Sequence, residues 1–252
     1  MKIIIKLFLA LLVVQNCFGL TFPNVEPISH DIFDKLLKKY VSEAGYVNYG
    51  GFKKEEKELK KYLDLVSSNA PAPDWTEKEK LAYWINAYNA FTIQLILDHA
   101  SYNIKSIKDI GDKIKIPFVN TPWDVKFIVI GGKKMDLNSI EHGIIRKQFK
   151  EPRIHFALVC AAKSCPPLRN EAFTAEKLDT QLTQQGEDFV NDKNKNDIKT
   201  NIVEISKIFD WYGGDFIGIN KIDLINKYSK IKANKDAKIS YKIYDWTLNG
   251  KL

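Results

Sequence analysis

The chain has 252 residues, of which 45% are hydrophobic and 12% aromatic, and it carries a formal net charge of +7. This composition is typical of a globular protein, and the sequence contains no internal repeat or low-complexity tract, which excludes repeat architectures. Lysines supply most of the positive charge and are spread along the chain, which favours a solvated basic surface and no nucleic-acid partner.

Residues 1–19 have the pattern of a signal peptide. Two lysines precede an apolar run from Leu7 to Val14, and small residues occupy the −3 and −1 positions of a cleavage site after Gly19. Acylation of Cys17 is disfavoured because bulky polar residues precede it. No later segment is apolar enough to span a membrane. We therefore expect a monomeric protein that is secreted or periplasmic after removal of the signal peptide.

Helical patterns fill the next part of the chain. Apolar residues at helical spacing predict helices over residues 30–40 and 52–67. Thr76 with Glu79 three residues later forms a predicted capping box, which opens a third helix. This helix is apolar on nearly all sides, so we expect it to be the central buried element. Residues 20–73 are interpreted as a helical N-terminal extension of a domain that spans residues 74–252.

Asn86 and Asn89 lie three residues apart on one face of the third helix. Buried amide side chains are costly unless they form hydrogen bonds. They are therefore expected either to bind backbone groups of a neighbouring loop, for which the loop after Cys160 is a candidate, or to orient a binding site. The structural role is favoured, and the binding role is kept as an alternative.

A hairpin and a further helix precede the most polar stretch. Residues 125–130 form a predicted strand that Gly131 and Gly132 turn back through residues 133–135. Asn138 and Glu141 resemble another capping box, which opens a helix over residues 139–149.

Residues 151–170 hold a histidine, two cysteines, two arginines and a lysine around one apolar run. The run from Ile154 to Ala162 predicts a buried strand that delivers polar side chains to a loop, where sites are often built. His155 and Cys160 are five residues apart and would point to opposite faces of a regular strand. Cys160 therefore needs a bend, a position beyond the strand end, or a different partner such as His142.

The last third mixes helices and strands. The pattern predicts a helix over residues 174–190, a strand over 202–209, an aromatic turn over 211–216, a helix over 224–229 and a final strand over 239–248. Helices followed by mixed elements indicate an α+β fold. We expect a single domain with a helical N-terminal half packed on a mixed or antiparallel sheet.

Four motifs together resemble a known family: WINAYNAFT at 84–92, IEHGIIR at 140–146, HFALVC with SCPPLR at 155–169, and YDWTLN at 244–249. They resemble the family called domain of unknown function 547 from about Asp74 to the C-terminus. As the name implies, the resemblance supplies no established reaction. Bacterial relatives are commonly predicted to be exported, which agrees with the leader.

The residue types allow a cysteine-dependent hydrolase or acyl transferase that acts on an amide, ester or peptide bond. Cys160 would be the nucleophile, and His142 or His155 would hold the thiolate. Glu141 or an asparagine amide would orient that histidine. Backbone amides of residues 161–164 would form an oxyanion hole. Lys163, Ser164 and Arg169 complete the expected binding set.

The competing hypothesis is a non-catalytic module at the cell surface that binds a peptide, a glycan or another protein. The expected partner is a small-molecule or peptide ligand. Cys160 and Cys165 would form a structural disulfide, which would deprive the catalytic hypothesis of its thiolate. The aromatic residues Trp123, Trp211, Tyr212 and Trp246 would line the binding groove. In a third hypothesis, Glu141, His142, His155 and Cys160 are metal ligands. Their spacing matches no standard zinc motif, so no metal or other cofactor is predicted.

Overall fold

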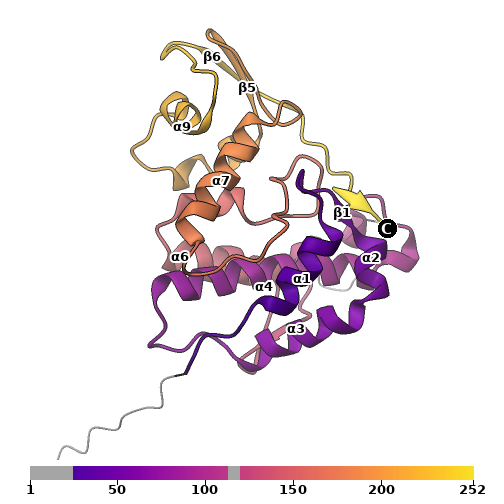
Figure 1. Cartoon of the computed structure of the whole chain (residues 1–252). Helices are drawn as coiled ribbons and strands as arrows, with labels where there is room; N and C mark the ends of the chain where they lie inside the picture. Colours follow the sequence, from indigo (N-terminus) through magenta and orange to yellow (C-terminus); the bar gives the residue numbers. More distant parts are fainter. Residues whose placement is uncertain (1–24, 113–119) are drawn as a thin grey trace, which may run out of the picture.

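The structure is a computed structural model, and it describes residues 25–112 and 120–252 (Figure 1). The predicted signal peptide lies outside the described residues. The α-helices are α1 (Asp31–Tyr40), α2 (Tyr49–Lys54), α3 (Glu56–Ser68), α4 (Glu77–Asp98), α5 (Asp109–Asp112), α6 (Arg146–Gln148), α7 (Leu178–Asn191), α8 (Ile208–Trp211) and α9 (Lys221–Tyr228). Shorter turns of 3₁₀-helix are η1 (Ala100–Tyr102), η2 (Pro122–Asp124), η4 (Pro152–Phe156) and η5 (Gly213–Asp215), while η3 (Ser139–Ile145) is a π-helix.

Helix α4 is the central element, as predicted. Thr76 caps it, because its side chain accepts from the amide of Glu79 while the Glu79 carboxylate accepts from the amide of Thr76. Every residue from Leu81 to Leu97 is buried. Helices α2 and α3 pack on α4, and α1 packs on α2 and α3 in the lower half of Figure 1.

The sequence predicts one helix over residues 52–67, and this prediction is wrong because the structure has two helices there. Helix α2 begins earlier, because the Asn48 side chain accepts a hydrogen bond from the amide of Gly51. Gly51 lies against the ring of Tyr40, where a side chain would collide. Glu55 then leaves the helical conformation between α2 and α3. The Asn48 cap lies outside the predicted segment, so the early start was not predicted.

The strands form three small sheets. Strand β1 (Val47–Asn48) pairs in parallel with β7 (Gly250–Lys251). The predicted hairpin is confirmed as β2 (Ile128–Ile130) and β3 (Lys133–Met135). The third sheet has the order β4–β5–β6, with one antiparallel and one parallel pairing. Its strands are β4 (Asp197–Ile198), β5 (Ile202–Ile205) and β6 (Lys238–Tyr241). The α+β class is thus confirmed.

The strand predicted over residues 154–162 is wrong. Pro152 opens the 3₁₀-helix η4, and the chain then continues as an irregular buried segment. The backbone groups of this segment form hydrogen bonds with a side chain and not with a strand. The Asn89 side chain donates to the carbonyl of Ala157 at 3.0 Å and accepts from the amide of Val159 at 3.0 Å. One asparagine therefore supplies hydrogen bonds that a neighbouring strand would otherwise give.

Two hydrophobic clusters support the fold. The larger cluster surrounds α4 and includes α1 to α3 and the segment after η4. The smaller cluster joins α7, α9 and the β4–β5–β6 sheet around Phe156, in the upper half of Figure 1. The C-terminal strand β7 returns to the larger cluster beside β1.

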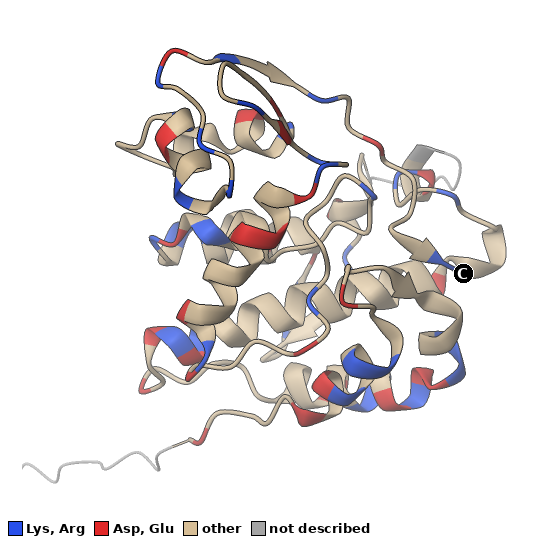
Figure 2. Ribbon diagram, turned by 45° about the horizontal axis from the view of Figure 1, so that its top comes forward, with Lys and Arg blue, Asp and Glu red and all other residues tan. Residues whose placement is uncertain are grey.

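Charged residues of both signs are interspersed on the outer helices (Figure 2). On α3, for example, Lys60 binds Glu56 one turn away. Surface ion pairs of this kind contribute little to stability but keep the surface solvated. Within residues 25–112 and 120–252, no helix has both the length and the hydropathy needed to cross a membrane.

Candidate functional site

A cavity of about 180 Å³ lies at the junction of the two hydrophobic clusters. Its aromatic lining residues are Tyr88, Trp123, Trp211, Tyr212, Tyr244 and Trp246. Its polar and sulfur-containing lining residues are Asn138, Glu141, His142, His155, Cys160 and Cys165. The four residues predicted to be catalytic and the four aromatic residues predicted to line a groove therefore meet in one cavity.

The π-helix η3 presents Glu141 and His142 to this cavity. The predicted capping box is wrong, because Asn138 is helical and its side chain makes no cap hydrogen bond. Asp136 has that role instead, since its carboxylate accepts from the amide and the hydroxyl of Ser139 at 2.7 Å each. π-Helical turns are uncommon and occur frequently at functional sites.

The Glu141 carboxylate is buried and accepts hydrogen bonds from the hydroxyls of Tyr88 and Tyr212. Burial, together with the negative charge of Glu141, raises the pKa of both tyrosines and of Tyr244. The three hydroxyls therefore stay protonated at neutral pH. The result is a fixed acceptor surrounded by aromatic rings.

His142 and His155 are joined through Arg146 and Asp215. Arg146 binds Asp215 through two nitrogens, at 2.6 and 2.7 Å, and the same carboxylate accepts from His155 Nε2 at 2.7 Å. The hydrogen bond from Arg146 has the largest effect on the Asp215 carboxylate. Together with the bond from His155 it lowers the pKa of Asp215 to about 2. Burial lowers the pKa of His155, which is 3% exposed and stacks on Tyr212 at 3.9 Å. His155 is therefore a neutral, structural member of the network.

Arg146 also fixes the hydrogen-bonding role of His142. Its guanidinium nitrogen Nη1 lies 3.0 Å from His142 Nδ1. Because a guanidinium only donates, Nδ1 is the acceptor and the proton of neutral His142 is on Nε2. The His142 side chain is 42% exposed. It is thus suited to donate a hydrogen bond to a ligand, next to the acceptor Glu141.

Tryptophans and a tyrosine form one wall of the cavity. Trp211 stacks on Trp246 with ring centroids 5.9 Å apart, and Tyr244 contacts both rings at 4.8 and 4.5 Å. Trp123 meets Trp246 edge to face at 5.8 Å. Trp211 is nonetheless 48% exposed. A large apolar surface therefore remains in contact with solvent at the mouth of the cavity.

Cys160 and Cys165 form a disulfide on the cavity wall, with Cα atoms 6.2 Å apart. Cys160 is half-buried, and its sulfur lies 3.3 Å from the hydroxyl of Tyr244. Cys165 is only 3% exposed, and its sulfur accepts from the amide of Cys160 at 2.9 Å. The hypothesis of a disulfide, left open by the sequence, thus agrees with this structure.

The C-terminal segment holds the disulfide loop in place. The amides of Lys163 and Ser164 donate to the carbonyls of Thr247 and Asp245 at 2.8 and 3.2 Å. The amide of Asn249 donates to the carbonyl of Ala161 at 3.0 Å. The amides of Lys163 and Ser164 are therefore not available to an oxyanion without breaking these bonds.

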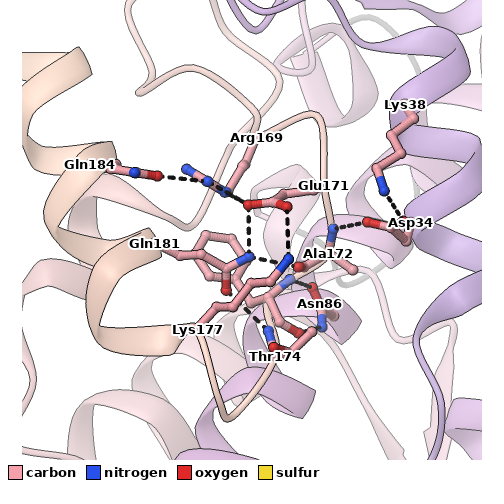
Figure 3. A network of polar contacts seen from close by, with 11 residues as sticks. Asp34, Lys38, Asn86, Arg169, Glu171, Ala172, Thr174, Lys177, Gln181 and Gln184 are labelled. Carbon is pink, nitrogen blue, oxygen red and sulfur yellow. Dashed lines mark hydrogen bonds and ion pairs between the residues drawn. The ribbon is translucent and has the colours of Figure 1, made fainter.

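The residues predicted to bind a ligand lie elsewhere. Asn86 pairs with both backbone groups of Phe173, and Asn89 pairs with the segment after η4. Lys163 and Ser164 line a separate surface pocket. Figure 3 shows that Arg169 points to Glu171 and Gln184, within a polar network that ties this loop to α7.

Several site residues were not predicted from the sequence. Tyr88 lies on α4, which is buried on all sides, so no single face of that helix indicated a site. Asp215 lies in a glycine-rich turn about 60 residues from its partner His155 in the chain. Only the aromatic content of the segments around residues 211 and 246 signalled their role. In the described part of the chain, no three His, Cys, Asp or Glu side chains are grouped to hold a metal ion.

The fold and site define an α+β protein whose C-terminal segment closes an aromatic cavity beside a disulfide. A family model with the description "Protein of unknown function, DUF547" matches residues 72–190. The matched segment includes α4, η3 and the disulfide, and the match confirms the resemblance predicted from the motifs. No curated protein and no solved structure matches the chain.

Proposed function

We propose that the protein is a binding module whose aromatic cavity takes a small amphipathic group, from a small molecule or from one side chain and its adjoining amide in a peptide. The observation that supports this proposal is that Trp123, Trp211 and Trp246 line one cavity, which Glu141 also lines. Apolar walls with a few fixed polar groups are typical of ligand sites.

The size and polarity of the cavity support the proposal of a small amphipathic ligand. Its volume of about 180 Å³ is below the roughly 300–1,000 Å³ of sites for drug-sized ligands. Glu141 supplies an acceptor, and His142 supplies a donor in the tautomer that Arg146 imposes. An amide, which offers one donor and one acceptor, is complementary to this pair.

The test uses N-acetylated, C-amidated single amino acids as probes, with ligand-observed saturation-transfer NMR. We expect binding by a subset with apolar side chains. Trp211→Ala should weaken it by about 2 kcal/mol, roughly thirtyfold, as for an aromatic residue at the centre of a binding site. Tyr102→Ala is the matched control, because Tyr102 is also an exposed aromatic residue and does not line this cavity. Equal binding by both variants, or no binding by any probe, contradicts the proposal.

A second candidate is a cysteine-dependent hydrolase or acyl transferase. It is favoured by the presence of Glu141, His142, His155 and Cys160 around one cavity. It requires prior reduction of Cys160, since a disulfide sulfur is not a nucleophile. It also requires that Nδ1 of His142 give up its contact with the Arg146 guanidinium for another partner. If substrate screening of the reduced protein finds hydrolysis, Cys160→Ser should abolish it; unchanged activity contradicts the assignment.

We also propose that the protein is exported. The leader pattern of residues 1–19 supports this, and the disulfide is compatible with an oxidising compartment. Expression with the native leader in a bacterial host, followed by fractionation and N-terminal sequencing, tests it. The expected product begins at Leu20 outside the cytoplasm, whereas an uncleaved cytoplasmic product contradicts it.

A further inference from the structure

We propose that the Cys160–Cys165 disulfide is redox-active and that it exchanges with a thiol that enters the aromatic cavity. This activity goes beyond ligand binding, and its test does not depend on the amino-acid probes above. Four features of the disulfide and its loop support it.

First, the disulfide is not needed to hold its loop. The loop is paired with the C-terminal segment through the amides of Lys163, Ser164 and Asn249, and through an isolated bridge between Ala162 and Leu248. The two cysteines are only five residues apart. A ring this short removes little entropy from the unfolded chain. A purely structural role therefore leaves the position of this disulfide at the cavity wall unexplained.

Second, the two cysteine residues differ in exposure. Cys160 is half-buried and contacts the Tyr244 hydroxyl within the cavity lining, whereas Cys165 is 3% exposed. An incoming thiolate must reach a sulfur along the S–S axis, so access decides which sulfur is attacked. The geometry assigns Cys160 as the attacked sulfur and Cys165 as the leaving group.

Third, the leaving group is already stabilised. The amide of Cys160 donates to the sulfur of Cys165 at 2.9 Å. A hydrogen bond to sulfur becomes stronger when the sulfur is a thiolate, and it lowers the pKa of the corresponding thiol. Exchange is faster when the departing thiolate is better stabilised.

Fourth, Ala161 lies inside the disulfide ring with a left-handed backbone conformation (φ = 60°) and is buried. An alanine in this region is strained, and such strain concentrates at functional sites. Two residues after Ala161, the amide of Lys163 donates a hydrogen bond to the carbonyl of Thr247. The strained conformation is therefore imposed by the surroundings and should persist when the disulfide opens.

The reaction balances as a two-electron exchange. A substrate thiolate attacks the sulfur of Cys160, a mixed disulfide forms, and the electron pair of the broken bond remains on Cys165. A second substrate thiolate then attacks the substrate sulfur of the mixed disulfide, which releases a substrate disulfide and leaves Cys160 reduced. Two substrate thiols are oxidised, their two protons pass to the cysteines, and a disulfide of higher potential reverses the process.

The first test equilibrates the oxidised, native wild-type protein with mixtures of reduced and oxidised glutathione. The products are trapped by acid and alkylation and counted by mass spectrometry. We expect reversible reduction without denaturant, a glutathione adduct that maps to Cys160, and cooperative unfolding in both redox states. A disulfide that resists glutathione until denaturant is added, an adduct confined to Cys165, or a chain that unfolds on reduction overturns the proposal.

The second test compares single-cysteine variants with an aromatic disulfide reagent, 5,5′-dithiobis(2-nitrobenzoate). In the folded state, Cys160 in Cys165→Ser should react about tenfold or more faster than Cys165 in Cys160→Ser, because reactivity follows exposure of the thiolate. In denaturant the two rates should be similar, which is the internal control. Equal rates in the folded proteins contradict the assignment. If a variant does not fold, the adduct mapping on the wild type decides.

The source of the thiol is distinguished by comparing glutathione with a reduced, unfolded protein at equal thiol concentration. Faster exchange with glutathione indicates a small-molecule thiol, and faster exchange with the unfolded protein indicates cysteine side chains of peptides. Failure of both to exchange with the native protein overturns the proposal.

Discussion

Asp215 is the residue on which the polar network behind the cavity depends. Its carboxylate accepts from Arg146 and His155 together, and these bonds lower its pKa from 3.8 to about 2. Such a shift corresponds to about 2 kcal/mol of stability at neutral pH. Asp215→Asn should therefore lower the free energy of unfolding by about that amount in urea titrations.

Asp210 provides a matched control for this substitution. It lies five residues earlier and pairs with Lys207 on the surface, where both side chains are exposed. Because exposed pairs contribute about 0–1 kcal/mol, Asp210→Asn should have a small effect. Similar losses for the two variants would contradict the importance assigned to Asp215.

The contribution of Asp215 also has a defined pH dependence. Its pKa is depressed in the folded state, so the unfolded chain takes up the proton first as the pH falls. The stabilisation is complete above the ordinary pKa of 3.8 and is lost as the pH falls towards about 2. The difference between wild type and Asp215→Asn should shrink over this interval in unfolding measurements. A difference that stays constant down to pH 2 would show that charge is not its cause.

Two helical glycines test the packing of individual elements. A Cβ atom on Gly186 of α7 would lie 2.9 Å from the ring of Tyr228 and 3.2 Å from Phe156. A Cβ atom on Gly143 of η3 would meet nothing within 4 Å. Gly186→Ala should destabilise by about 1–3 kcal/mol through overpacking. Gly143→Ala should stabilise by about 0.5–1 kcal/mol, because alanine restricts the unfolded chain. Thermal unfolding of both variants measures these changes in stability. A change of the same sign in both variants would contradict the packing described for the two glycines.

The elements differ in how far the sequence predicts them. Helix α4 follows from local signals, since Thr76 and Glu79 are neighbours and the apolar run is long. The segment after η4 could not be predicted, because its backbone partner is the Asn89 side chain about 70 residues away. Its apolar composition reflects burial, which strands and irregular core segments share.

The site shows the same limit. Glu141, His142, His155 and Cys160 were predicted from residue type and proximity in the chain, and they line one cavity. The contacts that set their roles come from Arg146, Asp215 and Tyr244, which lie on different elements. Residue types therefore indicate where a site lies, whereas tautomer, charge and accessibility depend on contacts that are distant in sequence.

At the scale of the whole molecule, the C-terminal segment completes both the fold and the cavity. Strand β7 pairs with β1, and Asn249 accepts a hydrogen bond from the buried hydroxyl of Tyr49 at 2.7 Å. Tyr244 and Trp246 line the cavity from the same segment. Strand β7 and the residues Tyr244, Trp246 and Asn249 lie after the matched family segment, which ends at residue 190, whereas β1 and Tyr49 lie before it.

A fragment restricted to residues 72–190 should therefore fail to fold cooperatively. It lacks β1, β7 and most of the smaller hydrophobic cluster, so much apolar surface of α4 and α7 would be exposed. Far-UV and near-UV circular dichroism during urea titration compares it with residues 20–252. Cooperative unfolding of the fragment with the stability of the longer chain would contradict this account.

The most direct measurement is a crystal structure of residues 20–252, oxidised and soaked with the best N-acetyl amino-acid amide from the NMR screen. The account predicts density for the side chain against Trp211 and Trp246, with the amide within hydrogen-bond distance of Glu141 and His142. A ligand bound elsewhere, with this cavity empty, would contradict the assignment of the cavity as the binding site.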